Sequence, residues 1–143
     1  MKKKLFVDTN IILSGIFFPG NESKLLSLMD IELYTSDLAI DEAKEVIRRK
    51  FEAFGMESSK IALEEFEHAI MDFKGIIQEK DYFRHLKTAK ENIKAEKDSK
   101  ILAAALTIKP DYFITGDSDF FQARIKRLIN VCKTKDALRE LGL

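Results

Sequence analysis

Cysteine, proline and tryptophan are scarce in this chain of 143 residues, which has one cysteine, two prolines and no tryptophan. The single cysteine, Cys132, excludes an intramolecular disulfide and a zinc site built from cysteines. It lies in the apolar run 128–132, so we interpret it as a small buried hydrophobic side chain. No apolar run approaches about 18 residues, and none has the form of a signal peptide. We therefore expect a soluble, cytoplasmic protein with no membrane partner.

Neither sign of charge dominates, because 24 basic and 24 acidic side chains cancel. The total charge therefore says nothing about a nucleic-acid partner, and any basic binding surface has to be local. Apolar residues make up 45% of the chain and include 11 phenylalanines, which is enough material for a core. A chain of this length is expected to form one domain, spanning residues 1–143.

The apolar periodicity predicts short strands that alternate with helices. The strands are expected at residues 4–8, 33–36, 75–78, 112–115 and 129–132. The helices are expected at residues 10–17, 21–29, 37–54, 57–73, 82–93, 97–107, 118–123 and 134–142. Asn21 and Thr134 are interpreted as helix caps, and Ile61 as a buried side chain. The alternation favours a parallel sheet with helices on both faces, and the largely helical region 55–95 is expected to form a clip or arm over it.

Acidic side chains stand at the ends of two predicted strands. Asp8 follows the first strand directly, and Asp117 and Asp119 follow the strand at 112–115. Glu42 lies on the edge of the apolar stripe of its helix, and Asp98 precedes the apolar stripe of another helix by one turn. We therefore expect all five acids to point towards one edge of the sheet, where parallel α/β sheets bind ligands.

Helix capping offers an alternative for three of these acids. Asp8, Asp98 and Asp117 all sit at or near predicted helix starts, where an aspartate accepts hydrogen bonds from free backbone N–H groups. The two roles are compatible, because the N-terminus of a helix also favours a phosphate group.

Carboxylates gathered at low dielectric repel one another, so the cluster requires a cation or a proton. Oxygen ligands without histidine or cysteine suit Mg²⁺ or Mn²⁺ rather than zinc. Such an ion can activate a water molecule and stabilise charge on a phosphate. Thr9, Asn10 and Thr115 are expected to fix the orientation of the carboxylates.

Basic side chains follow several of the acids along the chain. A lysine stripe with Lys94 and Lys97 leads to Asp98, Arg48 follows Glu42 on its helix, and Arg124 follows Asp119. Flanking phosphates of a nucleic acid could contact these groups while one phosphate meets the metal. The alternative is that they are simply solvated helix faces.

The sequence resembles a PIN-domain nuclease over essentially its whole length. The matching segments are residues 6–10, residues 36–47 with Glu42, residues 97–99 with the helix after them, and residues 114–120. The resemblance implies an α/β/α sandwich with a central parallel sheet of four to five strands. It also implies that Asp8, Glu42, Asp98 and Asp117 are the catalytic acids. The metal would be held by Asp8, Asp98, Asp117 and Asp119.

The implied activity is Mg²⁺- or Mn²⁺-dependent cleavage of single-stranded RNA. The implied biology is that of a toxin with a cognate antitoxin protein, and a homodimer. One departure concerns Lys97, which precedes Asp98 where the family often has a second acid. An RNA- or protein-binding module without turnover is the alternative. A phosphatase with an aspartyl nucleophile is set aside, because Asn10 stands where it needs a second aspartate. A phosphoacceptor signalling domain is disfavoured, because the acidic pair expected near the first strand is missing.

Overall fold

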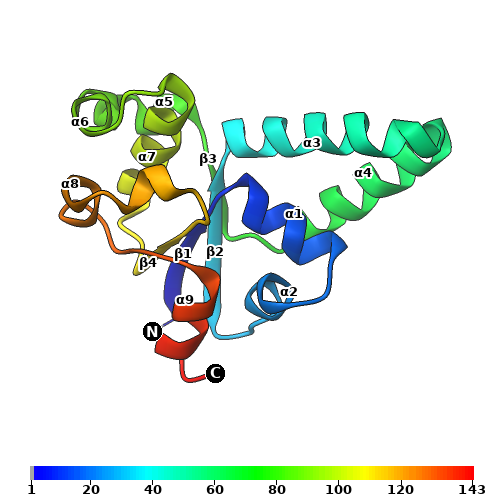
Figure 1. The fold of residues 1–143 in the computed structure, drawn as a ribbon, viewed down its shortest axis with the longest axis horizontal. Helices are drawn as coiled ribbons and strands as arrows, with labels where there is room; N and C mark the ends of the chain where they lie inside the picture. Colours follow the sequence, from blue (N-terminus) through cyan, green and yellow to red (C-terminus); the bar gives the residue numbers. More distant parts are fainter. Residues whose placement is uncertain (1) are drawn as a thin grey trace.

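The computed structural model describes residues 2–143, which form a five-stranded parallel sheet with helices on both faces (Figure 1). The strand order is β3-β2-β1-β4-β5. The strands span β1 Lys3–Val7, β2 Ile31–Ser36, β3 Gly75–Ile77, β4 Tyr112–Ile114 and β5 Val131–Cys132. The predicted α/β/α sandwich with a parallel sheet of four to five strands is therefore confirmed, with β1 at the centre.

The sheet is buried on both faces because its central strands are apolar on both faces. Side chains alternate along β1, so Leu5 and Val7 join one core cluster and Phe6 joins the other. Phe113 and Ile114 of β4 divide between the clusters in the same way.

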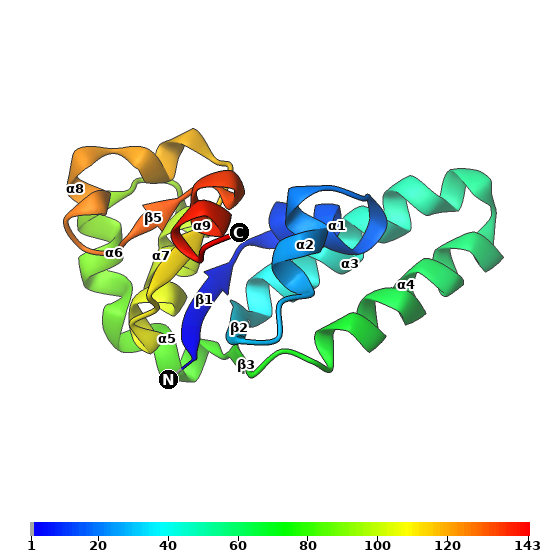
Figure 2. The ribbon, with the colours of Figure 1, turned by 90° about the horizontal axis from the view of Figure 1, so that it is seen from below.

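The helices separate into two layers, which Figure 2 shows on either side of the sheet. The helices packed on the face of Leu5 and Val7 are α1 Thr9–Phe17, α2 Asn21–Leu26, α3 Asp37–Phe51, α4 Met56–Ile70 and α9 Thr134–Glu140. Those on the face of Phe6 are α5 Glu79–Tyr82, α6 Leu86–Asn92, α7 Glu96–Ile108 and α8 Ala123–Lys126. The 3-10 turns are η1 Glu52–Phe54, η2 Phe83–His85 and η3 Ser118–Phe121.

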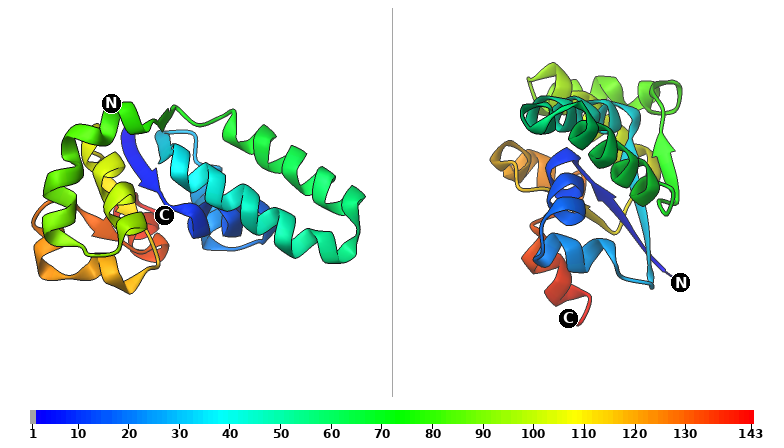
Figure 3. Two further views of the ribbon diagram at one scale, coloured as in Figure 1. Left: turned by 90° about the horizontal axis from the view of Figure 1, so that it is seen from above. Right: turned by 90° about the vertical axis from the view of Figure 1, so that its right-hand side faces the viewer.

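Helices α3 and α4 run antiparallel as a hairpin that projects beyond the sheet (Figure 3). The turn between them passes through η1 and Gly55, whose φ of 107° places it in the conformation that favours glycine. The expected arm at 55–95 is divided in this structure. Its first part is α4, whereas α5 and α6 pack against the core beside α7.

Several sequence-based boundaries were wrong. Helix 37–54 ends as an α-helix at Phe51, and helix 82–93 is broken into α5, η2 and α6. Helix 21–29 ends at Leu26, and residues 118–121 form a 3-10 turn rather than an α-helix. Each break falls where the chain has to turn to follow the core, and tertiary packing overrides local propensity there.

Four single-residue assignments were also wrong. Gly20, not Asn21, holds the cap position of α2, and Lys133 precedes Thr134 at the start of α9. The buried Thr134 hydroxyl has no hydrogen-bond partner among the described residues. Ile61 is half exposed because it lies on the outer part of the hairpin, and Cys132 is only partly buried.

Candidate metal site at the carboxyl edge of the sheet

The pairing of β1 with β4 places the ends of two distant chain segments side by side. Val7 pairs with Ile114, so the next residues, Asp8 and Thr115, face each other at the carboxyl edge. The Thr115 hydroxyl donates a hydrogen bond to Oδ2 of Asp8 and accepts one from the backbone N–H of Asp117, at 3.1 Å. One buried threonine therefore connects the two acids, as expected for a group that orients a carboxylate.

Asp8 caps α1 and is 7% exposed. Its Oδ1 accepts a hydrogen bond from the backbone N–H of Ile11 at 3.4 Å. The pKa of the Asp8 carboxyl is raised from 3.8 to about 6, mainly by burial and against the hydrogen bonds from Thr115 and Ile11. The negative charges of Asp117 and Glu42 contribute to this rise, so both acids act on Asp8 across the site.

Asp98, Asp117 and Asp119 form the closest group of acids. Each offers a carboxylate oxygen, and the three oxygens all lie within 4.8 Å of one another. Asp117 caps η3, where its Oδ1 accepts a hydrogen bond from the N–H of Asp119 at 3.0 Å. Asp98 stands in the first turn of α7, which leads down into β4 and therefore begins at the carboxyl edge. The predicted capping role of Asp117 thus coexists with its place in this group, whereas Asp8 lies outside it and is linked to Asp117 through Thr115.

The electrostatics of this group fit a divalent cation. Partial burial raises the pKa of Asp98, and the charges of Asp117 and Asp119 raise it further. Within residues 2–143, no lysine or arginine forms an ion pair with Asp98, Asp117 or Asp119. Three converging carboxylates with no protein cation match the oxygen ligands of Mg²⁺ or Mn²⁺.

Glu42 is positioned by α3, whose first turn is capped by Ser36. The Ser36 hydroxyl accepts a hydrogen bond from the N–H of Ala39 at 3.2 Å. Glu42 does not join the group of three aspartates. Its Oε2 instead forms an ion pair with Nζ of Lys97, from the first turn of α7.

The two other expected orienting residues differ from Thr115. The buried Thr9 hydroxyl donates to the backbone carbonyl of Ala39 at 3.4 Å, so it ties α1 to α3 rather than touching a carboxylate. The exposed Asn10 side chain makes no hydrogen bond with the described residues. Thr35, which the sequence reading missed, donates to the carbonyl of Val7 at 2.7 Å and fixes the end of β1. The sequence did contain a signal for Thr35, which is a polar residue near the end of the apolar strand β2.

The edge turn that carries Asp117 and Asp119 is anchored by an aromatic stack. The Phe120 ring packs edge-on against Phe113 with 5.0 Å between centroids, and Phe113 packs against Phe6 at 5.5 Å. Since Phe120 immediately follows Asp119, this packing holds the turn against the sheet.

The basic residues expected to contact nucleic acid are exposed, and they differ in their partners. Arg48 approaches Glu45 at 3.9 Å, Arg124 donates to the Gln122 side chain at 3.1 Å, and Lys94 has no ion pair among the described residues. Lys97 is the member of this set that reaches one of the five acids.

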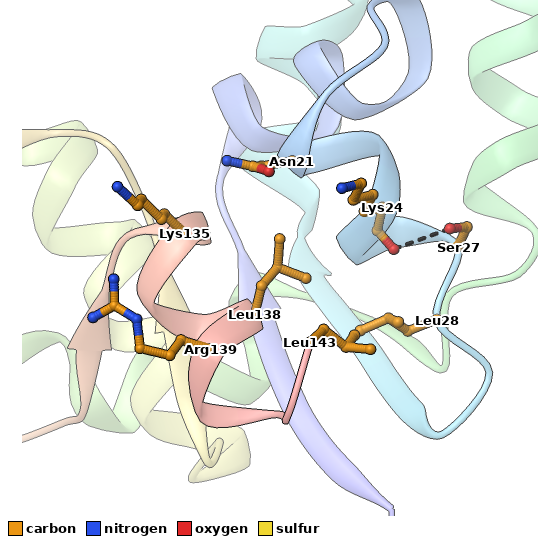
Figure 4. A pocket seen from close by; sticks show the side chains of 8 residues that line it. All are labelled: Asn21, Lys24, Ser27, Leu28, Lys135, Leu138, Arg139 and Leu143. Carbon is orange, nitrogen blue, oxygen red and sulfur yellow. Dashed lines mark hydrogen bonds between the residues drawn. The ribbon is translucent and has the colours of Figure 1, made fainter.

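One well-formed cavity lies outside this site. It has a volume of about 550 Å³ and lies between α2 and α9 (Figure 4). Its walls are Asn21, Lys24, Ser27, Leu28, Lys135, Leu138, Arg139 and Leu143. No acid of the cluster lines it. Among residues 2–143, no helix combines the length and the apolar character needed to cross a bilayer.

One family model matches most of this chain. The sequence profile of the PIN domain matches residues 4–119. No curated protein sequence matches the chain.

Three similar solved structures share its fold at low sequence identity. VapBC2 from Rickettsia felis, bound to a DNA fragment from its promoter, is 16% identical with a TM-score of 0.65, over 91% of this chain and 98% of that one. VapBC-1 from nontypeable Haemophilus influenzae is 18% identical with a TM-score of 0.67, over 92% and 98%. FitAcB from Neisseria gonorrhoeae is 17% identical with a TM-score of 0.62, over 92% and 98%.

Proposed function

The chain belongs to the PIN domain family, and from that premise we propose that it is a Mg²⁺- or Mn²⁺-dependent endoribonuclease acting on single-stranded RNA in the cytoplasm. The observation that supports this most strongly is the convergence of Asp98, Asp117 and Asp119 within 4.8 Å, with no ion pair to any of the three among residues 2–143. Carboxylates in that arrangement can hold a divalent ion and leave positions for water and a phosphate.

Each acid has a distinct part in this proposal. Asp98, Asp117 and Asp119 hold the ion, and Asp8 supports it from the buried side, oriented by Thr115 and Ile11. Glu42 acts from the α3 side of the cluster, where its carboxylate pairs with Lys97. The ion supplies Lewis-acid activation of water and of the scissile phosphate when bound.

The basic residues supply the contacts to flanking phosphates. Lys94 precedes Asp98 by four residues, and Arg124 follows Asp119 by five. Arg48, further along α3 from Glu42, would contact a longer RNA. Such contacts bind the backbone without reading sequence, so cleavage should weaken as salt rises.

The proposal is tested by cleavage of defined single-stranded RNAs with Mg²⁺, Mn²⁺ or a chelator. Asp98→Asn should reduce the rate by at least about a hundredfold, because a neutral amide cannot replace a carboxylate ligand. Asp72→Asn, at an exposed aspartate between α4 and β3, is the matched control and should cleave normally. RNA binding without cleavage in the unchanged protein would favour a binding module instead. Full activity of Asp98→Asn would exclude the proposed site.

We also propose that the protein is a toxin, that it forms a homodimer and that a cognate antitoxin inhibits it. The supporting observation is an apolar surface on the α3–α4 hairpin, which we call the hairpin groove. It has a volume of about 480 Å³ and is lined by Phe17, Phe51, Phe54, Ser58, Ile61, Ala62 and Glu65. Exposed apolar surface of this kind marks sites of protein association. Co-purification with the product of the neighbouring gene and a light-scattering mass test these two associations. A monomer mass would exclude the homodimer.

A further inference from the structure

Lys97 is the one cation that reaches the acidic cluster in the part of the chain that the structure describes. Its Nζ forms an ion pair with Oε2 of Glu42, which joins the first turn of α7 to α3. The Lys97 side chain is 59% exposed and that of Glu42 only 27% exposed, so the lysine reaches from the surface inwards. The family resemblance leads one to expect an acid at position 97, so Lys97 reverses the sign of one charge in the site.

The contacts of the five acids divide them into two groups. Asp98, Asp117 and Asp119 converge and have no ion-pair partner among residues 2–143. Asp8 has both carboxylate oxygens engaged, by Ile11 and by Thr115, and Glu42 is engaged by Lys97. Glu42 is thus the member of the five whose charge is balanced by a protein cation among the described residues.

Lys97 also lies next to a member of the first group. It immediately precedes Asp98 in the first turn of α7, and its ion pair with Glu42 joins that turn to α3. The ammonium group therefore lies on the side of the cluster that faces α3. A second divalent ion would need carboxylate ligands from this side and would meet the charge of Lys97 there. A lysine ammonium is a compact point charge with three donors, which makes it a suitable replacement.

We propose that Lys97 occupies, through its ion pair with Glu42, the position of a second cation, so that the site binds one divalent ion, held by Asp98, Asp117 and Asp119. The inference rests on the proposed function only in assuming that the acids bind a divalent metal. It gives this chain a one-ion site whose second positive charge is permanent and covalently attached.

The test is the number of Mn²⁺ ions bound, measured by isothermal titration calorimetry on the metal-free protein. The unchanged protein should bind one Mn²⁺. Lys97→Ala should bind two, and its first ion should bind roughly threefold to tenfold more tightly because a neighbouring positive charge is gone. Lys97→Met, which keeps the length of the side chain, should behave in the same way. In these variants, two ions about 3.5–4 Å apart should also show magnetic coupling in the electron paramagnetic resonance spectrum of Mn²⁺.

The double variant Lys97→Ala with Glu42→Gln identifies the ligand of the second ion. It should return to one Mn²⁺, because the carboxylate that Lys97 released is no longer present. Lys100→Ala is the matched control, since Lys100 lies one turn along α7 and pairs with Glu96 at 3.9 Å. It should bind one ion with unchanged affinity.

Two results would overturn the inference. One is two Mn²⁺ ions on the unchanged protein, and the other is a single ion on folded Lys97→Ala and Lys97→Met. RNA cleavage separates this failure from failure of the proposed function. A protein that cleaves RNA with two ions bound contradicts only the inference. A protein that binds one ion and never cleaves contradicts only the function.

Discussion

Asp8 carries a carboxyl group whose burial conflicts with its charge. The side chain is almost fully buried and sits beside two further acids, which together raise its pKa from 3.8 to about 6. In the unfolded chain the same group ionises near 3.8. The folded, metal-free protein therefore holds this proton more tightly than the unfolded chain does.

This difference predicts how stability changes with pH. Because the folded pKa of Asp8 is the higher one, its contribution is fully present below about pH 4 and is lost as the pH rises through about 6. The loss amounts to at most about 3 kcal/mol. Denaturant unfolding in chelator from pH 4 to pH 7.5 measures it.

Asp8→Asn provides the comparison for this prediction. The amide cannot ionise, so the variant should lack this pH-dependent loss and should be more stable than the unchanged protein at pH 7 without metal. Added Mn²⁺ should remove the difference, because it stabilises the ionised carboxylates. An identical pH profile for both proteins would show that Asp8 does not titrate in this range.

At the scale of elements, the start of α3 determines where Glu42 stands. The buried Ser36 ends β2 and caps α3 through Ala39. The cap therefore fixes the point at which the helix leaves the sheet. Glu42 lies less than two turns beyond it, so a frayed first turn would displace this acid.

Ser36→Ala should lower the free energy of unfolding by about 1 kcal/mol, because the N–H of Ala39 loses its acceptor inside the protein. Chemical denaturation measures the change. Ser118→Ala, at an exposed serine, is the control and should stay within about 0.5 kcal/mol of the unchanged protein. Equal stability of Ser36→Ala and the unchanged protein would show that water replaces the cap.

Elements with strong periodicity were predictable from sequence, and their breaks were not. The stripes of α3 and α7, the acid at the end of β1 and the turn after β4 all follow local patterns. The division of 82–93 into α5, η2 and α6 depends on how Tyr82, Leu86 and Ala89 reach α7 and the sheet. Local propensity does not contain that information.

The candidate site shows the same limit. The acids could be assigned to one sheet edge because parallel strands place their carboxyl ends together. The ion pair between Lys97 and Glu42 joins two helices that are far apart in the sequence. From the sequence, Lys97 fitted a lysine stripe for nucleic acid equally well, and only the packing of α7 against α3 reveals its partner.

At the scale of the whole molecule, the hairpin separates apolar surface from the acidic edge. Phe54 is 78% exposed and Met56 is 86% exposed at the turn between α3 and α4. Neither side chain contributes to either core cluster. Phe54, which lines the hairpin groove, and Met56 at the same turn can therefore be changed without disturbing the core or the acids.

The double change Phe54→Ser with Met56→Ser should weaken inhibition by a cognate antitoxin by about tenfold or more, because exposed aromatic anchors dominate such interfaces. RNA cleavage and thermal stability should remain unchanged. Titration of the antitoxin into a cleavage assay measures the effect. Phe83→Ser, at a side chain 68% exposed on η2, is the control, and the antitoxin should inhibit this variant normally. A stronger effect from Phe83→Ser would place the partner on the opposite face.

Helix α3 is a single uninterrupted rod of 15 residues, about 22 Å long at 1.5 Å per residue. Glu42 sits near its inner end and Phe51 at its outer end, beside the hairpin groove. A protein that binds the outer end of α3 therefore contacts the helix that carries Glu42, the partner of Lys97. A tilt of α3 would separate the Glu42 carboxylate from the Lys97 ammonium while Asp98, Asp117 and Asp119, on other elements, stayed in place. Binding at the tip of the hairpin and the charge balance at the sheet edge are thus linked through one helix.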